Sequence, residues 1–183
     1  MGKSDIEAAM RKLAALLDEA AIPYAIVNAM ALNQLGYQRM TADVDVLLSV
    51  EGLAAFKSLH LGRGYVEKFA GSKGVRDTEH NVDIDVVIAG QYPGDGKPKA
   101  VSFPDPRIAE QGSAVRLLPL PRMVELKLAS GLTAPHRLKD LADVQELIRA
   151  ATLPRTLAEA LDASVRDKYL ELWDAVAQAQ QDE

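Results

Sequence analysis

The chain has 183 residues, of which 48% are hydrophobic and 26% are charged, and its formal net charge at pH 7 is −5. This composition is ordinary for a globular protein with its own core, and the negative charge argues against a protein that is basic over its whole surface, as many nucleic-acid-binding proteins are. Because the sequence has no cysteine and no apolar run of about 18 residues, we expect no disulfide, no cysteine-ligated zinc, no membrane span and a cytoplasmic localisation.

Helical and strand-like segments alternate along the first half of the chain. Apolar residues at helical spacing predict a helix over residues 4–21, and Pro23 separates it from a short apolar strand at 24–27. A short helix is expected at 29–36, with Gly36 as its C-terminal cap. Period-2 and apolar patterns predict four further strands, at 43–50, 65–69, 75–78 and 81–89. A helix is expected between the first two of them, at 53–61.

The second half is expected to be mainly helical. Residues 91–99 are rich in proline and glycine and predict a loop, in which Lys97 and Lys99 either contact a phosphate or are simply solvated. A last strand is expected at 115–118, followed by helices at 122–130, from 138, and from about 156 to the C-terminus. The sequence therefore predicts an α+β fold, with a mixed-sheet core over 1–118 and a helical cap or extension over 119–183 packed on that core.

Two Asp-x-Asp pairs begin strongly apolar strands. Asp43 and Asp45 point to one face of their strand because successive side chains alternate, and Asp83 and Asp85 repeat the pattern. Neighbouring carboxylates repel each other, and a hard cation such as Mg²⁺ removes that repulsion. We interpret Asp43, Asp45 and Asp85 as metal ligands, with Asp83 as the alternative third ligand. Solvated surface strands remain the competing interpretation.

Residues 23–45 carry a more specific pattern, PYAIVNAMALNQLGYQRMTADVD, which contains the run Arg39-x-Thr41-x-Asp43-x-Asp45. This pattern resembles the signature of the nucleotidyltransferase superfamily, in which a strand ends in a glycine pair or Gly-Ser, a short helix follows, and Arg-x-Thr-x-Asp-x-Asp opens the next strand. It is similar to polymerase-β-like minimal nucleotidyltransferases, particularly the branch of abortive-infection toxins.

A second part of the resemblance lies downstream. Lys127, followed by the Arg-x-Lys-Asp run at 137–140, is similar to a helical motif of these proteins. The resemblance implies a nucleotide-binding set made of Asn28, Ala29, Met30, Arg39, Thr41, Lys127, Lys139 and Asp140. The competing roles are a salt bridge for Arg39, a strand opening for Thr41, a stem that extends to solvent for Lys127, and a solvated helix face for Lys139 and Asp140.

The resemblance implies a transferase that uses Mg²⁺, with Mn²⁺ as a substitute, to move an NMP from an NTP such as ATP to a hydroxyl of RNA, tRNA or protein. The implied setting is a toxin–antitoxin or phage-defence system, with a cognate antitoxin as a partner. One departure favours an alternative. Asn28-Ala29 replaces the glycine pair that lets the backbone approach phosphate. The alternative is a non-catalytic binding or regulatory protein of the same fold, and a metal-dependent phosphatase or nuclease is a third possibility.

Overall fold

The computed structural model describes residues 3–28 and 42–181. The predicted helix at 29–36 therefore lies outside the described residues. No helix in the described part of the chain is long and apolar enough to cross a membrane.

The chain divides into two compact units. The first unit contains the sheet, and its described residues are 3–28, 42–90 and 104–118. The second unit is helical, and its described residues are 91–103 and 119–181. The predicted division after residue 118 stays a prediction, and in the structure the loop 91–103 belongs to the helical unit.

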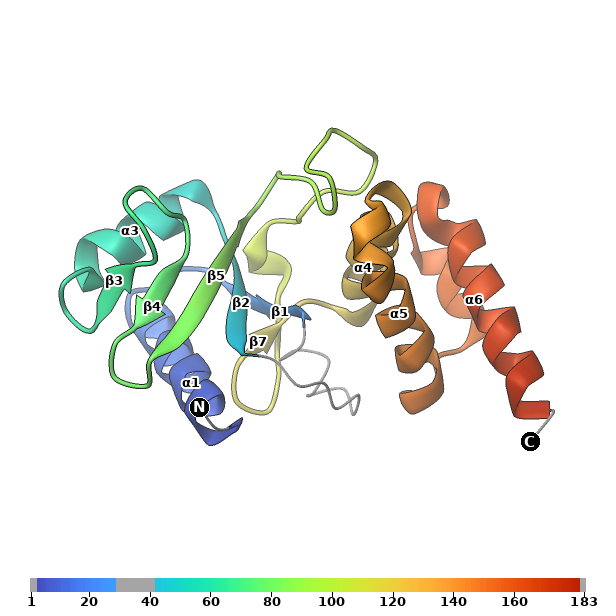
Figure 1. Cartoon of the computed structure of the whole chain (residues 1–183), viewed down its shortest axis with the longest axis horizontal. Coiled ribbons are helices and arrows are strands. Elements are labelled where there is room, and N and C mark those ends of the chain that lie inside the picture. The colour runs from blue at the N-terminus through green and yellow to red at the C-terminus, as the bar shows by residue number, and fades with distance from the viewer. Residues whose placement is uncertain (1–2, 29–41, 182–183) are drawn as a thin grey trace. The chain divides into compact units, whose positions relative to one another are not determined.

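The first unit is built on a seven-stranded mixed sheet with the order β3-β4-β5-β2-β1-β7-β6 (Figure 1). Its strands are β1 (Ala25–Val27), β2 (Asp43–Leu48), β3 (Tyr65–Glu67), β4 (Val75–Asp77), β5 (Val82–Ile88), β6 (Glu110–Gln111) and β7 (Arg116–Leu117). Parallel pairs join β2 to β5 and β1 to β7, and the other pairs are antiparallel. The predicted α+β fold with a mixed sheet is confirmed.

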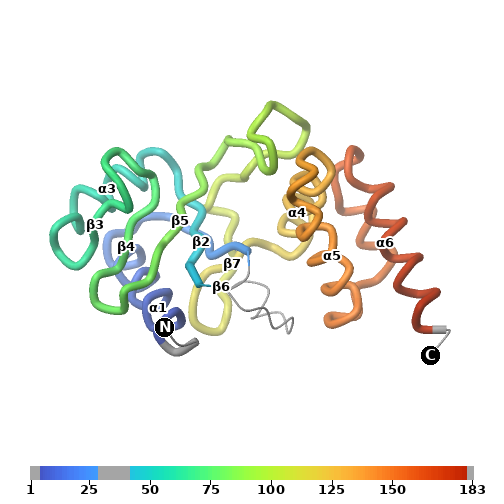
Figure 2. Tube along the Cα trace, viewed as in Figure 1, coloured from blue at the N-terminus to red at the C-terminus, as the bar shows by residue number. Residues whose placement is uncertain are grey.

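The short β6–β7 hairpin adds one strand that the sequence patterns did not predict (Figure 2). Glu110 and Gln111 of β6 are exposed polar residues, so no alternation of apolar and polar side chains marks this strand.

One face of the sheet carries the core of the first unit. The helices α1 (Lys3–Glu19) and α3 (Val50–His60) contribute Leu13, Leu17 and Phe56, which pack with Val46 and Ile84 of the two central strands. Burial alternates along β5, with its odd-numbered residues less buried than its even-numbered ones. β2 and β5 therefore turn Val44, Val46, Ile84 and Val86 to α1 and α3, and their aspartates to the opposite face.

The second unit contains α4 (Leu120–Thr133), α5 (Leu138–Ala150) and α6 (Ala163–Gln181). The predicted last helix is interrupted, because residues Arg155–Ala160 form a 3₁₀ helix that ends before α6 begins. Asp162 explains the interruption. Its carboxylate accepts hydrogen bonds from the backbone N–H and hydroxyl of Ser164, and its own N–H donates to Glu125 at 2.6 Å. These bonds hold the chain in a new helix start.

Candidate active site

The two Asp-x-Asp pairs lie side by side on the sheet. In the parallel β2–β5 pair, Asp43 is opposite Asp83 and Asp45 is opposite Asp85. The four residues are partly buried, and they alternate with fully buried residues such as Val44 and Ile84. Adjacent strands are about 4.8 Å apart. The register therefore gathers four carboxylates on one face of neighbouring strands.

The end of β1 lies at the same place in the sheet. Val27, the last residue of β1, is opposite Asp45 in the antiparallel β1–β2 pair. Asn28 follows with φ +56°, in the left-handed region that glycine adopts most easily. Asparagine tolerates this region better than most residues. Asn28 thus has a backbone angle that glycine also adopts easily. The other predicted residues of this segment, Ala29, Met30, Arg39 and Thr41, lie outside the described residues.

Two basic side chains contact the second aspartate pair. Lys68 Nζ lies 2.8 Å from Asp85 Oδ1 and 3.3 Å from Asp83 Oδ2, and Arg76 Nε lies 2.6 Å from Asp83 Oδ1. The hydrogen bond from Arg76 is the main reason that the pKa of Asp83 lies below its ordinary value. The hydrogen bond to Asp85 raises the pKa of Lys68. Sequence reasoning missed both cations, because they reach the aspartates only through the β3–β4–β5 pairing.

The donor set fits a hard divalent cation. Asp43, Asp45 and Asp85 offer carboxylate oxygens only, and they lie on one face of adjacent strands. At Asp85 the ammonium of Lys68 already supplies a positive charge. These residues therefore fit Mg²⁺ chemically, and at Asp85 the cation would meet a carboxylate that Lys68 already contacts.

A second acidic cluster in the sheet unit is held by internal ion pairs. Ligand atoms of Asp77, Glu79 and His80 lie within 4.8 Å of one another. Lys12 of α1 approaches Asp77 at 2.7 Å and Glu79 at 2.8 Å, and His80 Nδ1 lies 2.5 Å from Asp77. The ammonium of Lys12 also lies 5.1 Å from the ring centroid of Tyr65. Lys12 thus fills the cationic position, and the cluster ties α1 to the β4 end of the sheet.

A cavity of about 330 Å³ in the sheet unit lies at the other end of β1. Pro23 and Tyr24, which precede β1, contribute to its wall together with Asp18 and Arg116. Asn28 follows the opposite end of the strand. The cavity is therefore separate from the aspartate face.

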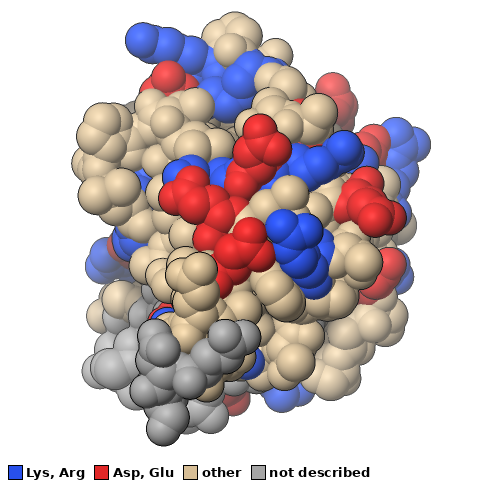
Figure 3. Space-filling view, turned by 90° about the vertical axis from the view of Figure 1, so that its right-hand side faces the viewer, with Lys and Arg blue, Asp and Glu red and all other residues tan. Residues whose placement is uncertain are grey.

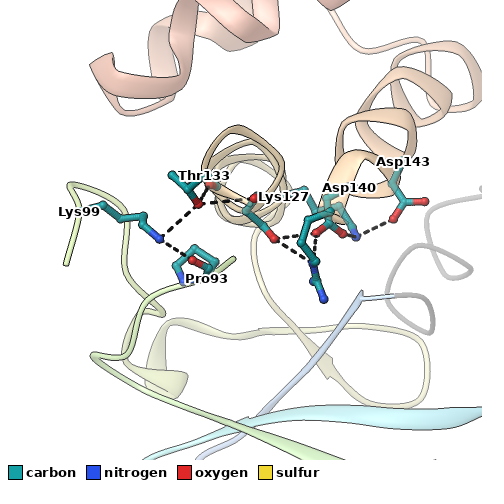
Figure 4. A network of polar contacts seen from close by, with 9 residues as sticks. Pro93, Lys99, Lys127, Thr133, Asp140 and Asp143 are labelled. Atoms are coloured by element: carbon teal, nitrogen blue, oxygen red, sulfur yellow. Dashed lines mark hydrogen bonds and ion pairs between the residues drawn. The ribbon is translucent and has the colours of Figure 1, made fainter. Parts of the chain in front are cut away.

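The helical unit contains a buried polar network (Figure 4). Lys127 Nζ of α4 lies 3.2 Å from Asp140 Oδ1 and 2.7 Å from Asp143 Oδ2, and these three side chains are at most 6% exposed. Asp140 also accepts hydrogen bonds from Ser130 at 2.6 Å and Arg137 at 2.8 Å. Burial alone would raise the pKa of Asp140, but the charges of Lys127 and Arg137 and the Ser130 hydroxyl hold it below its ordinary value.

This network gives two of the predicted nucleotide-binding residues a place inside the helical unit. The ammonium of Lys127 joins α4 to α5, and Asp140 is 2% exposed. Lys139, the neighbouring predicted residue, is exposed on α5. Their predicted role towards the nucleotide stays a prediction.

The loop 91–103 is tied to α4 by the other contacts drawn in Figure 4. Lys99 Nζ lies 2.6 Å from the Pro93 carbonyl oxygen and 3.3 Å from Thr133 Oγ1 of α4, and it forms an ion pair with Asp95. A Cβ on Gly94, whose φ is +75°, would lie 2.5 Å from Thr133 Oγ1. Lys99 therefore fastens the loop to its own helical unit.

Charges of both signs lie close together on the face of the helical unit seen in Figure 3. Ion pairs of this unit include Arg155–Asp174, Arg149–Glu146 and Lys168–Glu171. The face in view is thus not uniformly basic, and it lacks the single-sign charge that a nucleic-acid backbone would favour.

Comparison with known proteins shows the fold. No protein-family model and no curated protein sequence matches the chain. The crystal structure of ANT(2'')-Ia in complex with adenylyl-2''-tobramycin is 17% identical, with 91% of this chain and 99% of that chain covered and a TM-score of 0.58. This likeness shows that the chain has a nucleotidyltransferase fold, as the sequence resemblance implied.

Other solved structures are more distant. The solution structure of the antibiotic-resistance factor ANT(2'')-Ia is 17% identical over 99% of this chain and 97% of that chain, with a TM-score of 0.49. A crystal structure of a protein from H. pylori assigned as a nucleotidyltransferase is 15% identical over 98% of this chain and 95% of that chain, also with a TM-score of 0.49.

Proposed function

We propose that this protein transfers an NMP from an NTP to a hydroxyl group of an acceptor, with Mg²⁺ as its cofactor. The observation that carries the proposal is the register of three adjacent strands. It brings Asp43 and Asp45 of β2 next to Asp85 of β5, at the end of β1 where Asn28 has glycine-like backbone geometry. Carboxylates beside a phosphate-binding turn are the arrangement that a metal–triphosphate complex requires.

On this proposal each residue has a separate task. Asp43 and Asp45 would hold the metal ion that accompanies the triphosphate, and Asp85 would bind the catalytic metal ion and help to take the proton from the acceptor hydroxyl. The acceptor oxygen would bond to the α-phosphorus as the bond between the α-phosphorus and the bridging oxygen breaks, and pyrophosphate would leave. Bound Mg²⁺ would neutralise charge on the phosphates and polarise the α-phosphorus. The amide of Asn28 would donate a hydrogen bond to a phosphate oxygen. Asp83 keeps Arg76 as its partner, so Asp85 is our choice for the third carboxylate.

The acceptor is an open part of the proposal. The sequence resemblance favours RNA, tRNA or a protein, in a system with a cognate antitoxin. The similar ANT(2'')-Ia structure contains an adenylylated aminoglycoside. A small polyhydroxylated acceptor therefore joins RNA and protein as a candidate.

A transfer assay tests the proposal. The purified chain is incubated with Mg²⁺, each of the four NTPs labelled at the α-phosphate, and RNA, protein or aminoglycoside acceptors. We expect label on one acceptor class and a loss of about a hundredfold or more in Asp45→Asn. Asp174→Asn is the matched control, because it removes an exposed carboxylate of the helical unit. Transfer that is equally fast in Asp45→Asn would contradict the proposal.

The ion pair between Lys68 and Asp85 favours one second candidate, a non-catalytic binding protein of the same fold. A permanent ammonium at Asp85 would replace the metal and leave nucleotide binding without transfer. Calorimetry separates the two functions. NTP binding that needs no divalent ion, together with no transfer to any acceptor, supports the binding protein, whereas binding that requires Mg²⁺ supports the transferase.

A further inference from the structure

Lys68 makes close contacts with the sheet face that carries Asp43, Asp45, Asp83 and Asp85. It follows β3, and its ammonium contacts both carboxylates of the β5 pair, at 2.8 Å from Asp85 and 3.3 Å from Asp83. Its side chain is 26% exposed, compared with 45% for Asp85. The charge of Lys68 therefore lies against the carboxylates, with only part of the side chain in solvent.

Gly74 provides the space through which Lys68 reaches Asp85. A Cβ at Gly74 would lie 2.9 Å from Cδ of Lys68, 3.0 Å from the Ile84 carbonyl oxygen and 3.2 Å from Asp85 Oδ1. The backbone N–H of Lys68 also donates to the Gly74 carbonyl oxygen at 3.3 Å. A larger residue at Gly74 would therefore crowd both the lysine stem and the Asp85 carboxylate.

The two cations on this face differ in what they hold. Arg76 is directly opposite Asp83 in the β4–β5 register and contacts Asp83 at 2.6 Å. Of the two cations, Lys68 is the one that contacts Asp85. When Lys68 leaves, Asp83 keeps Arg76 while Asp85 loses its counter-ion. Movement of Lys68 therefore selects Asp85 as the carboxylate that becomes available.

We propose that Lys68 is an internal counter-ion that competes with the divalent metal for Asp85, so that the metal binds well only together with the nucleotide. This inference rests on the proposed function. A free divalent ion must displace the ammonium and leave it close to a positive charge. A metal–NTP complex brings negative phosphates to which the displaced ammonium can turn, which removes that repulsion. Lys68 thus makes metal binding depend on NTP.

Mn²⁺ titration of the full chain, followed by electron paramagnetic resonance of the free ion, measures this competition without any transfer step. We expect Lys68→Met to bind Mn²⁺ alone about two- to fivefold more tightly than the unmodified chain, as is typical for removal of a part-exposed ion pair. With a non-hydrolysable NTP present, the advantage of Lys68→Met should disappear or reverse.

Lys168→Met is the matched control, because it also removes one lysine charge from a side chain that is 25% exposed, but in the helical unit. Equal Mn²⁺ affinity in Lys68→Met, Lys168→Met and the unmodified chain would overturn the inference. The proposed metal site would survive that result if Asp45→Asn abolished Mn²⁺ binding. No binding to any variant, with or without NTP, would overturn both the inference and the metal site.

A labelling experiment on the unmodified chain gives an independent answer. Acylation of lysine amines, quantified by mass spectrometry, should increase severalfold at Lys68 when Mn²⁺ alone is raised to saturation, because displacement frees the amine. Lys57, whose Nζ lies 2.6 Å from Glu67, should react at the same rate throughout. A rate at Lys68 that does not change while Mn²⁺ binds would contradict displacement.

Discussion

Lys127→Met separates the structural role of this lysine from the phosphate-binding role that the sequence resemblance implies. In the structure its ammonium lies 2.7 Å from Asp143 and 3.2 Å from Asp140, and its side chain is 6% exposed. Methionine keeps most of the volume of the stem and removes the charge. We expect the helical unit to lose stability, because two buried carboxylates lose a cation.

The size of this loss of stability depends on the contacts that Asp140 and Asp143 keep when the Lys127 ammonium is removed. Removal of one partner of a buried ion pair costs about 3–5 kcal/mol. Asp140 keeps Arg137 at 2.8 Å and the Ser130 hydroxyl at 2.6 Å, so the charge of Asp140 stays partly compensated. We therefore expect a loss of about 3 kcal/mol, at the lower end of that range. The double variant Lys127→Met with Asp143→Asn should recover part of this loss, because it removes one of the two buried carboxylate charges that Lys127 contacts.

Urea unfolding followed by tryptophan fluorescence measures this loss in the right place. Trp173 is the single tryptophan of the chain, and its indole N–H donates to the Leu153 carbonyl oxygen at 2.8 Å within the helical unit. Lys168→Met, at an exposed ion pair, should change stability by less than about 1 kcal/mol. A Lys127→Met variant that is as stable as the unmodified chain but no longer binds NTP would refute the structural role and support the phosphate role.

Further predictions concern pH, one backbone angle and the second acidic cluster. Because the folded pKa of Asp140 is lowered, its contribution to stability is present above the unfolded value of about 3.9 and is lost as pH falls further. The urea midpoint reported by Trp173 should be flat from about pH 5 to 8 and should fall below about pH 4, and a decline between pH 7 and 5 would contradict this. Asn28→Gly should leave the midpoint of thermal unfolding nearly unchanged, because glycine accepts the φ of +56°. Asn28→Val should lower the free energy of unfolding by about 1–2 kcal/mol. Equal midpoints for the two variants would argue against the left-handed angle. Lys12→Met should destabilise the sheet unit by about 2 kcal/mol, since Asp77 is fully buried, without changing Mn²⁺ affinity. Stability retained with Mn²⁺ binding altered would instead identify a metal site at this cluster.

The sheet could be predicted from sequence where local pattern decides the structure. Asp43 and Asp45 alternate with Val44 and other apolar residues, and strand periodicity alone places the two aspartates on one face. From the sequence alone, the position of Asp85 beside Asp45 was a hypothesis. It depends on which strands pair and in which register, and a shift of one residue would have turned Asp85 to the core.

The partners of the charged side chains could not be predicted. Lys68 follows a short strand and Lys127 lies among the apolar residues of a helix, and no local pattern indicates which carboxylates they contact. Lys68 reaches Asp85 across Gly74, and Lys127 meets Asp143 through the packing of α4 on α5. These are long-range contacts, and local spacing contains no information about them. The glycine-like angle at Asn28 was foreseeable, because asparagine is one of the few residues that accept it.

Anomalous diffraction from crystals soaked with Mn²⁺ and a non-hydrolysable NTP tests the central claim most directly. We predict an anomalous peak within coordination distance of carboxylate oxygens of Asp43, Asp45 and Asp85, with Lys68 withdrawn from Asp85 and the phosphates beside Asn28. A peak that is held instead by Asp77, or an NTP bound with no metal at Asp43 and Asp45, would contradict it.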